Sequence, residues 1–223
     1  LPVGAPYLVM EWASSGTLED APAPDDWHDV LGVLVAMLDA LGHAHGRGIL
    51  HRLRDLILAG GGDPLLDTTT LAKLAGQLKA AGVREVRGAF KVYDGALPTI
   101  ASIDPDQPDH VGYDPAVCGL NLNFNRVHFE WKRGGGGYDV TMEARSDRFR
   151  PAVEVAAMSV ESRTGPVYTY ERREGRDLWT VAQGALGDGG ARWLPVRNPA
   201  IYAGEVFQTF ARSHGIVLKK PTR

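Results

Sequence analysis

The chain has 223 residues, a net charge of −3 at pH 7, and a balanced composition of 44% hydrophobic and 23% charged residues. This length is enough to bury a sizeable core in one or two domains. The charge argues against a surface that coats nucleic acid, the single cysteine excludes an internal disulfide framework, and no apolar run approaches the roughly 18 residues of a membrane span.

The first 50 residues predict a strand followed by a long helix. The run "PYLVMEWA" suits a buried strand, and the turn "SSG" follows it. In the segment 27–45 the apolar residues recur at i, i+3 and i+4, which predicts an amphipathic helix that Asp25 or Asp26 can cap. Its apolar stripe comprises Val30, Leu31, Leu34, Met37, Leu38 and Leu41.

These first residues resemble the middle of a protein kinase. "PYLVMEWASSGTLED" is similar to the hinge between the kinase lobes, and "VLVAMLDALGHAHGRGILHR" to the helix that leads into the catalytic loop. The resemblance implies that Met10 is the gatekeeper and that the backbones of Glu11 and Ala13 face an adenine. Leu53 stands where the catalytic aspartate belongs, and the sequence contains no G-x-G-x-x-G, V-A-I-K or D-F-G motif. We therefore expect no kinase catalysis.

The next segment predicts a second helix, a strand and a long loop. The helix runs from about residue 69 to 81, with Asp67 or Thr68 as its cap and Gly82 as its stop. "VREVRGAFKVYD" then suits a strand. The segment 98–119 contains four prolines and is expected to be a loop.

From about Leu120 the apolar pattern changes to a period of two, which is typical of strands. "RVHFEWK" and "YDVTMEA" flank four glycines and predict a hairpin. "VEVAAMSV", "PVYTYE", "DLWTVAQG" and "ARWLPV" continue as strands. A last helix begins at Asn198-Pro199 and ends near Gly215, and "IVL" is expected to be a short strand.

From about Leu56 onward the chain resembles the D-alanyl-D-alanine carboxypeptidase/endopeptidase group of low-molecular-mass class C penicillin-binding proteins. The resemblance rests on "LAGGGDPLLDTTTLAKLAGQLKAAGVREVRGAF", "QPDHVGYDPAVCGLNLNFNRVHFEW", "PVYTY" and "ALGDGGARWLPVRNPAIYAGEVFQTFARSHGIVL". It implies a periplasmic or extracellular serine acyl-transferase that acts on the D-Ala-D-Ala stem peptides of peptidoglycan. Two proteins therefore meet between about Arg52 and Leu56.

The mechanism of that family needs a Ser-x-x-Lys, a Ser-x-Asn and a Lys-Thr-Gly motif, and this sequence contains none of them. Thr70 and Lys73 have the first spacing, but they fall on a predicted helix of an accessory region. We expect no catalytic residue in the chain, no metal site and no cofactor.

The binding candidates are weaker. Asn121, Asn123 and Asn125 alternate with apolar residues and could line a cleft for substrate, although a hydrogen-bonded strand edge explains them as well. Arg192 and Arg197 could hold an anionic peptide terminus or bridge neighbouring elements. Cys118 suits a small buried hydrophobe rather than a nucleophile. A group of acidic residues with one histidine suits a solvated loop better than a metal site; it comprises Asp104, Asp106, Asp109 and His110.

These observations predict an α+β chain. A kinase-like strand and long helix (1–55) precede a mostly antiparallel β region with two helices, the partial carboxypeptidase-like region 56–223. The expected function is that of a catalytically inactive piece of a D-Ala-D-Ala carboxypeptidase that could contact the peptidoglycan stem peptide. The alternatives are a pseudokinase-like nucleotide binder and a recombined chain with no selected function.

The composition and the family resemblance also lead to expectations about partners and cellular location. We expect no nucleic acid and no membrane span, and the stripe on the helix over 27–45 offers a surface for self-association. The family resembled is periplasmic, but no signal peptide is recognisable at Leu1, so the localisation stays unknown.

Overall fold

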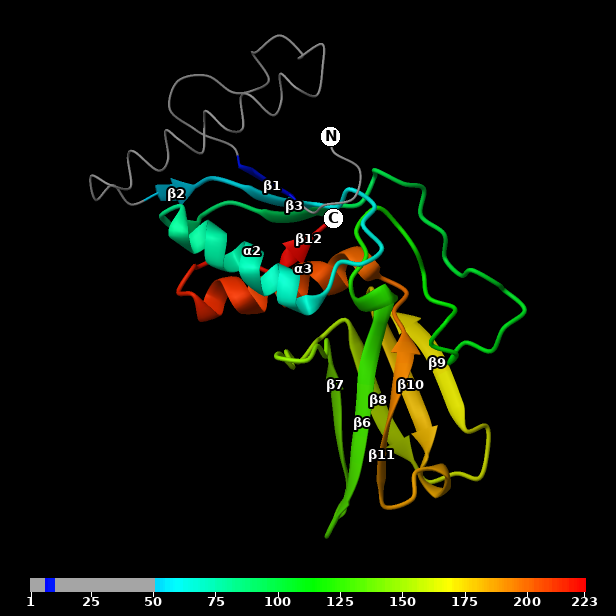
Figure 1. Ribbon diagram of the computed structural model, residues 1–223. Helices are drawn as coiled ribbons and strands as arrows, with labels where there is room; N and C mark the ends of the chain where they lie inside the picture. Colours follow the sequence, from blue (N-terminus) through cyan, green and yellow to red (C-terminus); the bar gives the residue numbers. More distant parts are fainter. Residues whose placement is uncertain (1–6, 11–50) are drawn as a thin grey trace.

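The computed structural model describes residues 7–10 and 51–223 (Figure 1). The expected helix over 27–45, with its proposed self-association surface, and the hinge residues Glu11 and Ala13 lie outside these ranges. The described part mixes two α-helices with several small sheets, which confirms the α+β class. No helix within it is long and apolar enough to cross a membrane.

One layer is a four-stranded sheet in the order β1 (Tyr7–Met10), β3 (Leu56–Ala59), β5 (Phe90–Tyr93) and β12 (Pro221–Thr222). β1 runs antiparallel to β3, whereas β3, β5 and β12 run parallel to one another. The strand expected within "PYLVMEWA" therefore forms, and it pairs with a strand from the carboxypeptidase-like region. Two further short strands, β2 (His51–Leu53) and β4 (Val83–Val86), pair in parallel beside this sheet.

Two helices, α2 (Thr68–Ala80) and α3 (Pro199–Ser213), lie side by side below this sheet (Figure 1). α2 begins where the sequence predicts, because the Asp67 carboxylate accepts a hydrogen bond from the Thr70 backbone N–H at 2.7 Å. Gly82 follows the helix with a φ of 87°, a conformation that favours glycine.

The second body consists of two three-stranded sheets that extend away from the helices (Figure 1). β6 (Arg126–Gly134) pairs antiparallel with both β7 (Gly137–Glu143) and β11 (Gly189–Pro195). The predicted hairpin is present, with Trp131 opposite Val140. In the other sheet β10 (Arg176–Ala182) is antiparallel to β9 (Tyr168–Arg173) and parallel to β8 (Ala156–Glu161).

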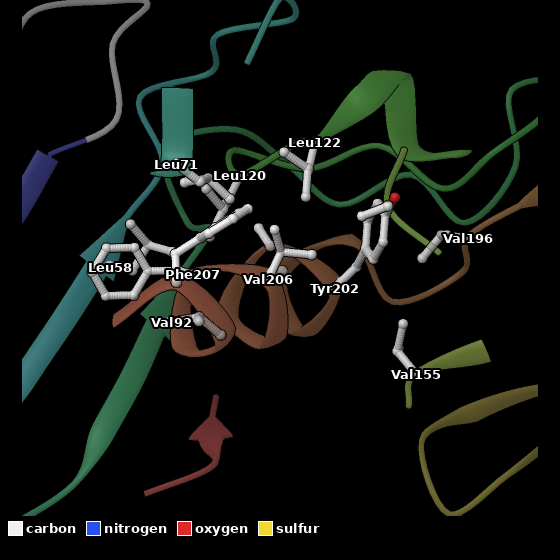
Figure 2. Close-up of a cluster of buried hydrophobic side chains, with 14 of the residues drawn as sticks. Leu58, Leu71, Val92, Leu120, Leu122, Val155, Val196, Tyr202, Val206 and Phe207 are labelled. Carbon is white, nitrogen blue, oxygen red and sulfur yellow. The ribbon is translucent and has the colours of Figure 1, made fainter. Parts of the chain in front are cut away.

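One contiguous hydrophobic core joins the two bodies. Figure 2 shows α3 at its centre, with Phe207 close to Leu58 of β3 and Tyr202 close to Leu122 and Val196. Phe207 and Tyr202 are fully buried, and burying one such side chain stabilises the fold by about 1.5–3 kcal/mol. α3 therefore contacts the upper sheet with one end and the lower sheets with the other.

Two sequence predictions differ from the structure in detail. "VREVRGAFKVYD" forms two strands rather than one, because the chain bends at Gly88, where any Cβ would overlap the Arg54 carbonyl oxygen. The period-two pattern from Leu120 does not begin as a strand. Residues Asn123–Asn125 form a short 3-10 turn in which all three φ angles are positive, at 51°, 55° and 52°.

Candidate functional site

A pocket of about 380 Å³ opens beside the turn Asn123–Asn125, where β6 begins. Its walls come from three segments far apart in the sequence: the start of the loop before α2, the loop 98–119, and the turn itself. Most of the lining is apolar. The lining residues are Pro64, Ile103, Gly112, Tyr113, Pro115, Val117, Asn121, Phe124, Asn125 and Arg126.

Phe124 stands at the rim of this pocket with 56% of its surface exposed. Its φ of 55° is in the left-handed region, which costs an ordinary residue about 1–2 kcal/mol. Strain of this kind persists only where the surrounding structure imposes it, and it gathers at binding sites. The turn thus holds a large apolar side chain at the mouth of a concave surface.

Arg126 is the only basic residue in the pocket lining. Its guanidinium carbon lies 5.2 Å from the ring centre of Phe124 and 5.5 Å from that of Trp193, within the range of cation–π attraction. Its Nε is buried and has no hydrogen-bond partner among the described residues. Within the described part of the chain, no hydrogen bond or ion pair holds its side chain.

Asn121 and Asn125, two of the three candidate substrate-binding residues, line the pocket, but their amides are already engaged. Asn125 Nδ2 donates to the Ala116 carbonyl at 2.7 Å, and its Oδ1 accepts from the Leu122 N–H at 3.0 Å. Asn121 Oδ1 accepts from the Cys118 N–H at 3.1 Å. Both residues therefore fix the shape of the wall.

Asn123, the third predicted residue, is not part of the pocket lining. Its Nδ2 donates to the Thr68 hydroxyl at 2.9 Å and to the Tyr202 hydroxyl at 3.3 Å. Tyr202 in turn donates to the Arg126 carbonyl at 2.9 Å. This chain of contacts connects the start of α2, the first turn of α3 and the residue that carries the guanidinium.

A buried ion pair anchors the loop that supplies Ile103 and Tyr113. Asp114 accepts hydrogen bonds from the Ser102 hydroxyl and the Ile103 N–H, and Arg197 lies 3.5 Å from its carboxylate. Burial alone would raise the pKa of Asp114, but these hydrogen bonds and the guanidinium outweigh it and lower the pKa. Arg197 thus bridges neighbouring elements, one of the two roles considered for it.

A second polar cluster lies on the sheet of β6 and β7. Ligand atoms of His128, Glu130 and Glu143 lie within 4.8 Å of one another, a spacing that could hold a metal ion. However, Arg145 donates to both carboxylates and its Nη1 lies 3.4 Å from His128 Nε2. Burial first, and then the charge of Arg145, lower the pKa of His128. The cluster is therefore an internal ion-pair network in which the guanidinium supplies the cation.

The remaining candidates have structural surroundings. The Thr70 hydroxyl donates to the Asp67 carboxylate at the start of α2. Cys118 is fully buried, and burial raises the pKa of its thiol to about 11, as expected for a packing residue. His110 stacks on Tyr168 at 5.0 Å. The guanidinium carbon of Arg192 lies over the same Tyr168 ring, 4.9 Å from its centre.

Part of the chain is similar in sequence to a known protein kinase. The chain is 35% identical over 109 residues to the serine/threonine-protein kinase PknK of Mycobacterium tuberculosis and of Mycobacterium bovis. The match covers 44% of this chain but only 10% of the kinase. This partial homologue agrees with the resemblance seen in "PYLVMEWASSGTLED" and the following helix.

Among solved structures, the chain is similar to penicillin binding protein 4 (dacB) from Haemophilus influenzae, with a TM-score of 0.54 and 18% identity. The match covers 76% of this chain and 39% of that protein. The same protein complexed with a novel beta-lactam gives a TM-score of 0.52 and 17% identity, over 78% and 38%. At this identity the likeness concerns the fold alone.

The family comparison extends over most of the chain. The model of the D-Ala-D-Ala carboxypeptidase 3 (S13) family matches residues 49–221, a range that includes every helix and almost every strand of the described part. The match agrees with the resemblance that begins near Leu56. The chain belongs to the D-Ala-D-Ala carboxypeptidase 3 (S13) family.

Proposed function

We propose that residues 56–223 form the substrate-positioning part of a peptidoglycan D-Ala-D-Ala carboxypeptidase-like protein and that this chain alone is catalytically inactive. The observation that carries the proposal is the apolar pocket beside the turn Asn123–Asn125, which combines concave walls with one unpaired guanidinium. Such pockets with few convergent polar groups are the usual binding sites for small ligands. The pocket would take the stem peptide.

Catalytic inactivity follows from the sequence. None of the three motifs of the serine mechanism is present in the chain, and Thr70, the only residue at the Ser-x-x-Lys spacing, is engaged as part of a helix cap. A fluorescent penicillin incubated with the pure protein should therefore leave no acid-stable label. Label mapped by mass spectrometry to any serine, or to Thr70, would contradict this part of the proposal.

Peptide positioning needs its own measurement. Titration of the isotope-labelled protein with an acetylated D-Ala-D-Ala peptide should shift the NMR signals of the pocket residues, in particular those of Gly112 and Phe124. Signals of the hairpin tip at Gly135, which lies at the far end of β6, serve as the internal control. Shifts confined to other surfaces, or no shift at millimolar peptide, would show that the pocket does not bind this ligand.

The division at about residue 55 also stays a proposal. The kinase homologue supports a kinase origin for the first segment, but the backbones proposed to face adenine, at Glu11 and Ala13, lie outside the described residues. Because no phosphate-binding motif is present, we expect no tight ATP binding. Micromolar affinity corresponds to about 8 kcal/mol. A melting shift equivalent to micromolar affinity for Mg-ATP would favour the pseudokinase alternative.

A further inference from the structure

We propose that Arg126 makes this pocket a carboxylate site, one that binds the C-terminal carboxylate of a short peptide whose last side chain lies against the apolar wall. The inference rests on the proposed function, because it names the group of the ligand that the pocket recognises. It rests on the surroundings of the Arg126 side chain.

Among the described residues, the Arg126 guanidinium has no hydrogen-bond or ion-pair partner. The described residues provide it with two aromatic rings but with no carboxylate or carbonyl oxygen. Arginine carries five N–H donors and stays charged, so a half-buried guanidinium without acceptors forgoes hydrogen bonds that most others make. A carboxylate can accept two of them in parallel, which is the strongest pairing available to arginine.

The Arg126 side chain is held in place before any ligand binds. Phe124 and Trp193 contact the guanidinium at similar distances, 5.2 and 5.5 Å. The Arg126 carbonyl is fixed by the Tyr202 hydroxyl at 2.9 Å. Because the ordering of a long side chain is a large part of the cost of binding, a prepositioned guanidinium binds an anion more tightly than a mobile one.

The charges around the guanidinium also favour an anionic ligand. No residue in the lining is acidic, and the buried carboxylate of the loop 98–119, that of Asp114, is already paired with Arg197. Ile103, Pro115 and Val117 make the wall apolar. An ion pair beside such a wall is screened less than one in open water. The pocket is therefore complementary to one negative charge attached to an apolar group.

These features favour a carboxylate over a phosphate. A phosphate group carries up to two charges and is commonly bound by several cations or by a series of backbone N–H groups. Here a single guanidinium faces apolar walls, and the Asn123 and Asn125 N–H groups donate to the Leu66 and Leu122 carbonyls. A planar, singly charged carboxylate next to a small or apolar side chain fits this arrangement.

The test compares an acid with its amide. Binding of N-acetyl-D-Ala-D-Ala and of its C-terminal carboxamide to the full chain is measured by NMR titration, with inorganic phosphate and N-acetyl-L-leucine as further probes. We expect the acid to bind about tenfold more tightly than the amide, the difference of one charge-assisted pair. Phosphate should bind more weakly than either acid.

Two variants connect this preference to the guanidinium. Arg126→Gln should abolish the acid-over-amide preference, and Arg126→Lys should reduce it, because lysine keeps the charge but lacks the planar fork. Arg192→Gln is the matched control: it removes another arginine that lies over an aromatic ring, outside the pocket lining, and should leave the preference intact. Circular dichroism establishes that each variant is folded, and Arg126→Lys preserves the test if Arg126→Gln is not.

The outcomes separate this inference from the proposed function. If N-acetyl-L-leucine binds the wild-type chain but not Arg126→Gln, while the D-Ala-D-Ala peptide does not bind, the carboxylate site stands and the stem-peptide assignment fails. Equal affinity for acid and amide in the wild-type chain, tighter binding of phosphate, or an unchanged preference in both Arg126 variants each overturns the inference.

Discussion

At the scale of the residue, the left-handed turn is the feature on which the pocket depends. Asn125 keeps a φ of 52° and makes three hydrogen bonds through a buried amide, to the Ala116 carbonyl, Asn121 Oδ1 and the Leu122 N–H. Asparagine tolerates this conformation better than other residues with a Cβ, because its short polar side chain bonds locally. The turn therefore combines backbone strain with a side chain that compensates for it.

Asn125→Ala should destabilise the fold by about 2–3 kcal/mol, since it leaves a buried donor and acceptors unpaired and loses the tolerance of asparagine for positive φ. Urea unfolding measures the change. Gln107→Ala removes an amide whose two hydrogen bonds, to Asp104 and from the exposed Tyr113 hydroxyl, lie near the surface, and it should change stability by less than about 0.5 kcal/mol. Equal effects of the two substitutions would show that the Asn125 network does not stabilise the turn.

His128 should make stability dependent on pH. Burial and Arg145 lower the pKa of His128 in the folded chain, whereas in the unfolded chain it takes up a proton near pH 6.5. The unfolded state therefore binds the proton preferentially, and the free energy of unfolding should fall as the pH drops below about 6.5. The groups facing the ring are Glu130, Glu143 and Arg145.

The measurement is the free energy of unfolding in urea between pH 7.5 and 5. His128→Gln should give a flatter profile over this range than the wild type, and His214→Gln, a variant of an exposed histidine just after α3, is the control. If the wild type and His128→Gln have parallel profiles, the titration of His128 does not contribute to stability.

Sequence alone could find part of this site and not its central residue. The alternation of Asn121, Asn123 and Asn125 marks the segment that forms one wall of the candidate pocket, and two of these three residues line it. Arg126 could not be found in this way, because its significance is the lack of a partner. That lack depends on Trp193, on Phe124 and on the course of a proline-rich loop, and none of these is fixed by local sequence.

At the scale of the element, caps and periodicity predicted most helices and strands correctly. Asp67 and Gly82 delimit α2, and Asn198 is the N-cap of α3, with Pro199 as the first residue of that helix. The apolar periodicity of the sequence did not predict which distant strands pair with one another. The parallel ladder of β8 and β10, and the split of β4 from β5 at Gly88, arise from contacts with distant segments rather than from the period of the chain itself.

The hairpin of β6 and β7 offers a matched set of glycine substitutions. Gly134 pairs with Gly137, so Gly135 and Gly136 form the loop, and a Cβ at Gly135, Gly136 or Gly137 would meet nothing within 4 Å. Of these three only Gly137 has a positive φ, 141°. Gly136→Ala should stabilise the protein by about 0.4–1 kcal/mol by restricting the unfolded chain.

Gly137→Ala should instead be destabilising, because its backbone conformation is accessible almost only to glycine. Thermal unfolding of the two variants provides the comparison. Since neither alanine meets a neighbouring atom, a difference in melting temperature can come only from the backbone. Two variants with the same melting temperature would contradict the φ angles of this loop.

At the scale of the whole molecule, the described part of the chain is one structure built from two bodies. α3 contributes Phe207 to the core below the upper sheet and Tyr202 to the core above the lower sheets (Figure 2). The pairing of β1 with β3 connects the kinase-like segment to the carboxypeptidase-like one through backbone hydrogen bonds. The sheet of the carboxypeptidase-like region therefore includes a strand, β1, from the segment that resembles a protein kinase.

Because the core is continuous, residues 56–223 should unfold in a single cooperative transition. Pulse-labelling hydrogen exchange in urea, read by mass spectrometry, would give a midpoint for peptides from α2 and α3 and another for peptides from β8 and β10. These midpoints should coincide, as two-state unfolding requires.

Tyr202→Phe removes the hydroxyl that donates to the Arg126 carbonyl. It should lower both urea midpoints together, which corresponds to a loss of about 1 kcal/mol in the free energy of unfolding. If the β8–β10 peptides unfold at lower urea than those of α2 and α3, the lower sheets are an independent unit, and Tyr202 does not couple the pocket to the helical core.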